Sequence, residues 1–294
     1  MGLEYYWDDR QRHIVAEKPD EFDLEQTLEC GQCFRWQRET DGSFSGIAFT
    51  RAINVAQVRE RLIFSGCTAN EFEGIWKVYF DLERDYGTIV EKLASHDAGM
   101  REAAAGGAGI RLLRQDPWET LVSFIISQNA NIPRIKKCVA SLCAAYGEPV
   151  QGGGGKLLFA FPKPEALGTC SPASVDACRL GYRAGYILDT AARVAADGGR
   201  TLYQAQSRSA DEAETYLLEL HGVGPKVADC VMLFGMGFYD RFPTDVWIRR
   251  AMARLYGLDE NNTKEIIAYA KSEFGELAGF AQQYLFQYAR LHFR

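Results

Sequence analysis

The sequence lacks any apolar run near the roughly 20 residues that a membrane-spanning helix needs, so we expect no membrane partner. Residues 1–9 lack the basic and then apolar pattern of a secretory signal, so we do not expect export. The glycine run at 152–155, expected to be a loop, lacks the following Lys-Ser/Thr of a phosphate-binding loop. Positive charge is not in excess either. The net charge of −6 argues against indiscriminate binding of nucleic acid, although it does not exclude a local basic face.

Paired cysteines are also scarce. Of the eight cysteines, only Cys30 and Cys33 have metal-like spacing, and no second close pair completes a set of four ligands. We therefore predict no metal site and no cofactor. The thiols are expected to be small buried residues in a reducing compartment, either a bacterial cytoplasm or a eukaryotic nucleus.

The order of the sequence patterns predicts an α+β fold that is rich in helix. Short alternating runs at 44–49, 52–55 and 61–64, with the hairpin signal Asp41-Gly42, indicate an antiparallel sheet. Helical patterns begin near 71–80 and dominate to the end of the chain. We predict an N-terminal antiparallel β-sheet domain with flanking helices at 1–107, a helical domain at 108–182, and a helix–hairpin–helix domain at 183–294.

The most informative segment is residues 220–230, which combines two glycines, a proline and a lysine in a short space. Gly222 and Gly224 predict a tight turn, because glycine adopts backbone angles barred to other residues. The turn separates expected helices at 211–220 and 226–236, and Pro225 suits the first position of the second one. Such a hairpin presents backbone N–H groups to a phosphate, so we assign phosphate binding to Gly222, Val223 and Gly224.

Two interpretations of Lys226 follow from this position. In the first, the lysine is one more phosphate contact, as in a non-catalytic DNA-binding hairpin. In the second, it is a nucleophile, which requires a neutral amine, and the positive potential of the first helical turn favours that form. The hairpin alone does not separate the two.

Asp245 lies nineteen residues after Lys226 and precedes a helical run at 246–252. Aspartate is a favoured N-cap, which is the simpler interpretation. A carboxylate facing the hairpin is also what glycosyl transfer needs, because breaking an N-glycosidic bond builds positive charge on the sugar. The cap and catalytic roles are compatible.

Together, the hairpin with Lys226 and the following Pro243-Thr244-Asp245 resemble the active-site core of the helix–hairpin–helix DNA glycosylases, and more narrowly of the 8-oxoguanine DNA glycosylases. The resemblance implies that Lys226 and Asp245 are catalytic. Some members of the superfamily bind an iron–sulfur cluster through C-terminal cysteines. No cysteine follows Cys230 here, which disfavours that subgroup.

The resemblance also implies a pocket for the oxidised base. Residues 31–36 resemble the family's G-Q-x-F-R-W strand, in which the glycine carbonyl, here that of Gly31, accepts a hydrogen bond from N7–H of the base. Cys230 lies beside the guanine pocket, Gln282 bonds the base edge, and Phe286 stacks on its face. Phe286 and Cys230 also lie on apolar helical faces, so both could simply belong to the core.

Within the duplex, the resemblance implies that Asn129 fills the gap left by the flipped base and that Tyr182 acts as a wedge. It also implies that Arg134 and Arg183 read the orphaned cytosine. The chain departs from the family in two places. Ala130 replaces the middle of three consecutive asparagines, and Trp247 stands where a histidine often contacts phosphate.

The sequence as a whole therefore predicts a monomeric, bifunctional DNA glycosylase and lyase. Its expected partner is double-stranded DNA containing an oxidised purine, chiefly 8-oxoguanine paired with cytosine, and its expected role is base excision repair. Two alternatives remain open: an alkylated-base DNA glycosylase, which would lack the hairpin lysine, and a non-catalytic helix–hairpin–helix DNA-binding protein.

Overall fold

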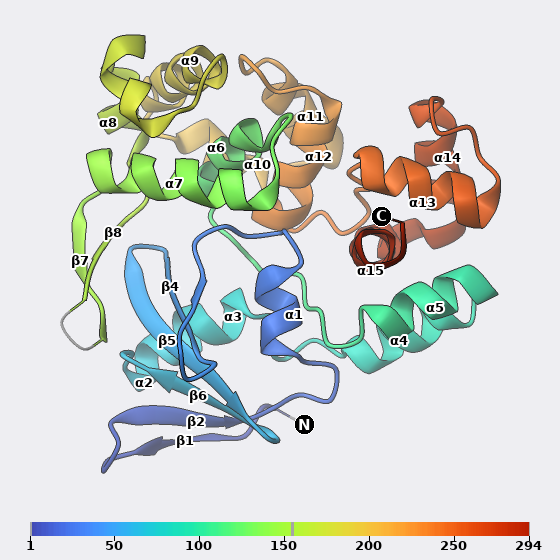
Figure 1. Ribbon diagram of the computed structural model, residues 1–294, viewed down its shortest axis with the longest axis horizontal. Helices are drawn as coiled ribbons and strands as arrows, with labels where there is room; N and C mark the ends of the chain where they lie inside the picture. The colour runs from blue at the N-terminus through green and yellow to red at the C-terminus, as the bar shows by residue number, and fades with distance from the viewer. Residues whose placement is uncertain (1, 154–155, 294) are drawn as a thin grey trace.

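The computed structural model describes residues 2–153 and 156–293, so residues 154 and 155 of the predicted glycine loop lie outside the described residues. An N-terminal antiparallel sheet is followed by a helical remainder, which confirms the predicted α+β class (Figure 1). The strands of the main sheet are β1 (Tyr5–Asp8), β2 (His13–Glu17), β3 (Gln37–Arg38), β4 (Phe44–Ala48), β5 (Arg51–Val58) and β6 (Arg61–Ser65).

The sheet is antiparallel throughout, in the order β1-β2-β6-β5-β4-β3. Ile14 and Val55 both pair with Phe64, and all three side chains are buried because alternate residues of a strand face the same side. These side chains pack against Leu28 and Trp76 from the helical segments beside the sheet. The predicted Asp41-Gly42 hairpin joins β3 to β4, with Gly42 at a φ of +86°.

The first helices are short and connect the sheet to the rest of the molecule. They are α1 (Leu24–Glu29), α2 (Ala69–Glu71), the π-helix η1 (Phe72–Trp76), α3 (Lys77–Tyr79), α4 (Tyr86–Ala94) and α5 (Ala98–Gly106). The central helices are α6 (Pro117–Ser127), α7 (Ile132–Tyr146), α8 (Pro164–Gly168), the 3-10 helix η3 (Pro172–Cys178), α9 (Arg183–Ala195) and α10 (Arg200–Ala205). A small hairpin, β7 (Pro149–Gln151) and β8 (Leu157–Phe159), follows α7.

The last helices carry the hairpin and most of the predicted site. They are α11 (Ala210–Leu218), α12 (Pro225–Val231), the π-helix η4 (Met232–Met236), α13 (Val246–Tyr256), α14 (Thr263–Phe274), the 3-10 helix η5 (Gly275–Leu277) and α15 (Ala278–His292). Asn131 caps α7 by accepting a hydrogen bond from Arg134 N, and Asp116 caps α6, where Pro117 takes the first position. These caps fix where the elements around the site begin.

The buried apolar residues form two clusters. One contains the sheet, α1 and the segments up to Leu82, together with Leu113. The other spans the helices and already includes Ile89 of α4 and Met100 of α5. Figure 1 shows α5 beside α15. The domain boundaries at 107 and 182 stay predictions. By packing alone, α4 and α5 belong with the later helices.

One prediction for this region is wrong. Residues 31–36 were expected to form a strand but adopt bends and irregular backbone between α1 and β3. Gly31 has a φ of +91°, which a regular strand does not tolerate. The segment is therefore a loop at the boundary of the two clusters, with Phe34 packed in the helical cluster and Trp36 in the sheet cluster, and it brings Gly31 to the site.

Candidate active site

The predicted helix–hairpin–helix is formed by α11 and α12, which meet at the turn 219–224. Gly222 has a φ of +81°, and a Cβ there would lie 2.4 Å from Tyr186 Cγ, so only glycine fits. Gln128 Nε2 donates to the Gly222 carbonyl at 3.0 Å and ties the turn to the end of α6. The expectation for Gly224 is wrong: its φ of −98° and ψ of 179° are extended backbone, because it is the N-cap of α12.

Lys226 lies in the first turn of α12 and is half-buried. Its Nζ donates to Ser127 Oγ at 3.4 Å and lies 5.1 Å from the centroid of the Phe124 ring. Among the described residues, no direct ion pair joins the amine to Asp245. The amine therefore rests on a hydroxyl and an aromatic face, with no carboxylate held against it.

Asp245 is the N-cap of α13. Its Oδ1 accepts hydrogen bonds from Trp247 N and Ile248 N, both at 2.9 Å, whereas no backbone N–H of the described residues donates to Oδ2. Burial raises the pKa of Asp245 above its usual range, while these hydrogen bonds and the charge of Lys226 act in the opposite direction. One oxygen thus fixes the carboxylate at the start of the helix, and the other takes no part in the cap.

A cavity of about 300 Å³ lies between α6, α7, α12, α13 and α15. The predicted catalytic pair and the predicted base pocket all line it: Lys226, Asp245, Gly31, Cys230, Gln282 and Phe286. These residues come from four segments that are far apart in the sequence. The fold therefore brings six of the predicted site residues to one chamber.

The lining residues differ in what they offer a ligand. Gly31 lies close to Phe286, since a Cβ on Gly31 would be 3.4 Å from Phe286 Cε1. Gln282 donates from Nε2 to the Pro243 carbonyl at 3.2 Å, and its buried Oε1 has no partner in the described structure. Burial raises the pKa of Cys230 to about 12, so its thiol stays neutral. The chamber thus combines an aromatic face with an unused acceptor.

The four residues predicted to fill the gap and to read the orphaned cytosine do not line this cavity. Asn129, with a φ of +49°, donates from Nδ2 to Tyr182 Oη at 3.2 Å, and both side chains are exposed. Arg134 is exposed on α7. Arg183 is only 4% exposed, and its Nε donates to the Gln128 carbonyl at 2.8 Å. In this state the guanidinium of Arg183 serves a backbone carbonyl and does not face solvent.

Sequence reasoning missed several residues that line the cavity. Phe124 stacks on Phe234 at 5.5 Å and forms one wall, and Ser127 holds the lysine. Gln283 and Arg290 lie on α15 beside the predicted Gln282 and Phe286. In a helix that is buried on most sides, the sequence does not indicate which residues face a cavity. Only the packed arrangement of α6, α12 and α15 around the cavity assigns them.

Seven of the eight cysteines are buried, and Cys170 is partly exposed. All eight are free, and among residues 2–153 and 156–293 no cluster of three or more His, Cys, Asp or Glu residues could hold a metal ion. Within the same residues, no helix is long and apolar enough to cross a membrane.

Asp229 on α12 carries a carboxyl group that the catalytic prediction did not include. Burial raises its pKa to about 7, and the neighbouring Glu214 and Asp240 add to this, while Arg241 opposes it from 3.8 Å. An aspartate in an unfolded chain titrates near 4. Between pH 5 and pH 8 the folded protein must therefore give up a proton that the unfolded chain has already lost, so stability falls as the pH rises.

We expect the free energy of unfolding to fall between pH 5 and pH 8 by roughly 2–3 kcal/mol less in Asp229→Asn than in wild type, because the buried charge no longer forms. Urea unfolding of both proteins at pH 5 and pH 8 measures it. Asp211→Asn, at an exposed position of α11, is the matched control. An equal loss of stability in wild type and Asp229→Asn would contradict the expectation.

Comparison with known proteins agrees with this geometry. Residues 14–121 match the family model "8-oxoguanine DNA glycosylase, N-terminal domain", and residues 122–276 match "HhH-GPD superfamily base excision DNA repair protein". A probable N-glycosylase/DNA lyase of Methanothermobacter thermautotrophicus is 30% identical over 92% of this chain and 94% of its own length.

Two solved structures are similar over nearly the whole chain. One is MBOgg1 in complex with a low-affinity DNA ligand, with 44% identity, full coverage of both chains and a TM-score of 0.94. The other is the Clostridium acetobutylicum 8-oxoguanine glycosylase/lyase bound to double-stranded DNA containing cytosine opposite 8-oxoguanine. It is 39% identical, with 99% of this chain and 98% of that chain covered and a TM-score of 0.92.

Proposed function

The chain belongs to the 8-oxoguanine DNA glycosylase family of the HhH-GPD superfamily, and we propose that it excises 8-oxoguanine paired with cytosine and then cleaves the strand. The observation that carries the proposal is that Lys226 and Asp245 share one cavity with the predicted base pocket. The substrate is duplex DNA, and the enzyme acts as a monomer. It works where the genomic DNA is, in a bacterial cytoplasm or a eukaryotic nucleus.

A base stacked inside a duplex cannot reach this cavity, so the enzyme extrudes the nucleotide. Unstacking costs a few kcal/mol, which contacts in the pocket and filling of the gap offset. Asn129 and Tyr182, already hydrogen-bonded to each other at the exposed surface, enter the gap. The backbone amides around Gly222, Val223 and Gly224 hold a phosphate of the damaged strand.

In the chemical step, the neutral amine of Lys226 attacks C1′ of the sugar. The new carbon–nitrogen bond forms as the glycosidic bond breaks, and the base leaves with the proton that the amine gives up. The sugar opens to a Schiff base, which makes the C2′ proton acidic. Loss of that proton breaks the C3′–O bond and cuts the strand 3′ to the lesion. Asp245 stabilises the positive charge that develops on the sugar, using the oxygen that its helix cap leaves free.

The base itself is recognised by acceptors and an aromatic face. The Gly31 carbonyl accepts from N7–H, a proton that guanine lacks, so one carbonyl discriminates the lesion. Phe286 stacks on the base, the free Oε1 of Gln282 accepts from the base edge, and the neutral thiol of Cys230 packs beside it. Across the duplex, Arg134 donates to N3 and O2 of the orphaned cytosine. Arg183 joins it after leaving the Gln128 carbonyl.

A test of this function is incubation with an 8-oxoguanine:C duplex and borohydride, which reduces the Schiff base to a stable covalent adduct. We expect an adduct and strand cleavage. A non-catalytic DNA-binding protein would bind without either, and an alkylated-base glycosylase would leave this lesion untouched. A guanine:C duplex of the same sequence is the control.

We expect Arg134→Ala to narrow the ratio of the cleavage rates on 8-oxoguanine:C and 8-oxoguanine:A by roughly tenfold. Adenine is larger and places its acceptors differently, and a good polar contact to a base is worth about 1–3 kcal/mol. Single-turnover rates on the two duplexes measure the ratio.

The alternative is that Arg134 contacts only phosphate, which positions the duplex without reading it. In that case both rates fall equally and the dependence on salt flattens. Lys137→Ala, an exposed lysine on the same helix, is the matched control for a general loss of positive charge.

A further inference from the structure

Gly31 lies between two backbone carbonyls that are held by glutamine side chains. The carbonyl before it, of Cys30, accepts from Gln283 Nε2 at 3.3 Å. The carbonyl after it, of Gln32, accepts from Gln115 Nε2 at 2.8 Å. Within the described residues, nothing donates to the carbonyl of Gly31 itself. Both neighbouring carbonyls are fixed, and the one between them is left for a ligand.

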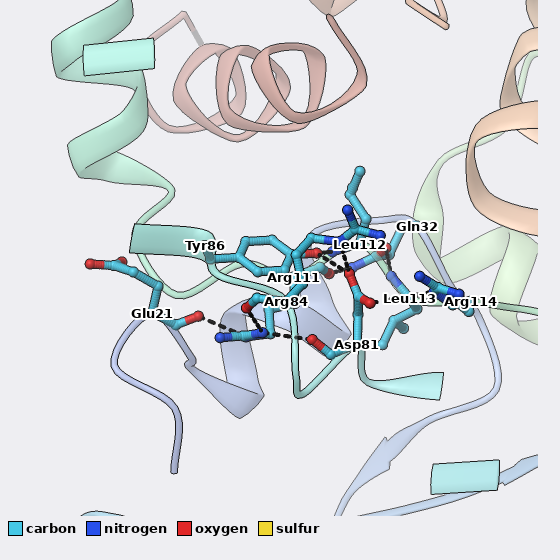
Figure 2. A network of polar contacts seen from close by, with 9 residues as sticks. All are labelled: Glu21, Gln32, Asp81, Arg84, Tyr86, Arg111, Leu112, Leu113 and Arg114. Atoms are coloured by element: carbon cyan, nitrogen blue, oxygen red, sulfur yellow. Dashed lines mark hydrogen bonds and ion pairs between the residues drawn. The ribbon is translucent and has the colours of Figure 1, made fainter. Parts of the chain in front are cut away.

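The side chain of Gln32 anchors the loop that contains Gly31 to the backbone of neighbouring segments. It is 1% exposed, and its Oε1 accepts from Leu113 N at 2.9 Å. Its Nε2 donates to the Arg111 carbonyl at 2.7 Å and to the Thr27 carbonyl at 2.9 Å. Figure 2 shows the Gln32 amide against the backbone of residues 111–113. Both the oxygen and the nitrogen of this amide therefore form hydrogen bonds with the protein's own backbone.

The backbone that Gln32 binds is itself held in place. Arg111 is 2% exposed, and its guanidinium donates to the carbonyls of Glu21 at 2.9 Å and Asp81 at 2.6 Å, as Figure 2 shows. The same guanidinium lies 4.3 Å from the centroid of the Tyr86 ring. Gln32 is therefore attached to a rigid part of the structure, where the sheet and helical clusters meet.

We propose that Gln32, Gln115 and Gln283 form a glutamine clamp that sets the direction of the Gly31 carbonyl and so determines lesion specificity. The inference rests on the proposed function, in which that carbonyl reads N7–H. Glycine at a φ of +91° has no side chain to restrain it, and a hydrogen bond weakens steeply when its angle is lost. The three glutamines are positioning residues, because they act on the base through Gly31.

The test compares two activities of the same protein. Strand cleavage at a preformed abasic site needs Lys226 but no base pocket, whereas release of 8-oxoguanine needs both. We expect Gln32→Leu to slow release of 8-oxoguanine about 10- to 100-fold in single turnover, and to change cleavage of the abasic duplex less than about threefold. A purely structural role would lower both activities together.

Gln115→Leu removes one arm of the clamp at a partly exposed position, so it decides the matter if Gln32→Leu does not fold. We expect it to slow base release selectively by roughly three- to tenfold. Gln57→Leu is the matched control: Gln57 accepts from Leu24 N at 2.8 Å in the same part of the chain, away from Gly31. Its ratio of the two activities should equal that of wild type.

An unchanged ratio in both clamp variants, with wild type releasing 8-oxoguanine, overturns the clamp alone. Failure of wild type to release 8-oxoguanine overturns the proposed function instead. A ratio that falls in Gln57→Leu as far as in the clamp variants also overturns the clamp, because a general loosening of the fold would then be the cause.

Discussion

Lys226→Gln should form no borohydride-trapped adduct and should release 8-oxoguanine at least about 10³-fold more slowly than wild type, because the covalent route disappears. Glutamine keeps much of the length of the lysine and can donate to Ser127 Oγ as the amine does at 3.4 Å. It has no amine to form a Schiff base. We therefore expect duplex binding, measured by fluorescence anisotropy, to change little.

Lys264→Gln, at an exposed position on α14 that does not line the cavity, removes the same charge and should trap as wild type does. Equal trapping by Lys226→Gln would remove the lysine from the mechanism and leave it as a phosphate contact. Loss of binding together with trapping would show that the lysine holds DNA and would leave its chemical role unsupported.

The hairpin was predictable because its determinants are local. Gly222, Pro225 and Lys226 lie within five positions of one another, and glycine and proline restrict the backbone in ways that need no tertiary context. Asp245 was likewise predicted as an N-cap, and it caps α13. The prediction for Gly224 was wrong because it used the same local rule. A glycine in the sequence permits a left-handed backbone but does not require it, and Gly224 is extended.

The sheet was only half predictable. Strands β4, β5 and β6 follow one another through short turns, and their alternating pattern is visible in the sequence. Strands β1 and β2 were not predicted. Residues His13–Glu17 pair with Arg61–Ser65, nearly fifty positions away, and β1 exposes Tyr6 and Trp7 on an edge without clear alternation. Pairing over that distance leaves little local signal.

The cavity could not be assembled from local patterns at all. Gly31 and Phe286 are 255 positions apart, and only the resemblance to a family placed them together before the structure did. Neither the sequence pattern nor the family resemblance indicated that the Arg183 guanidinium donates to the Gln128 carbonyl. Such a contact depends on where the end of α6 lies relative to α9, which is a property of the packed helices.

Asp245→Asn should release 8-oxoguanine roughly 10²- to 10³-fold more slowly than wild type while staying folded, because the substitution separates the two roles of the residue. Asparagine caps a helix about as well as aspartate, so the hydrogen bonds from Trp247 N and Ile248 N are kept. We expect the stability in urea to change by no more than about 0.5 kcal/mol. Only the negative charge facing the sugar is lost.

The pH profile of base release tests the same role without a mutation. Because burial raises the pKa of Asp245, the wild-type carboxylate takes up a proton at a higher pH than an exposed aspartate does. The ionised carboxylate is the active form, so the rate of base release by wild type should fall on acidification and approach that of Asp245→Asn. The rate of Asp245→Asn should show no such fall from this residue. If Asp245→Asn instead releases the base as fast as wild type across the profile, the carboxylate is a helix cap and stabilises no charge on the sugar.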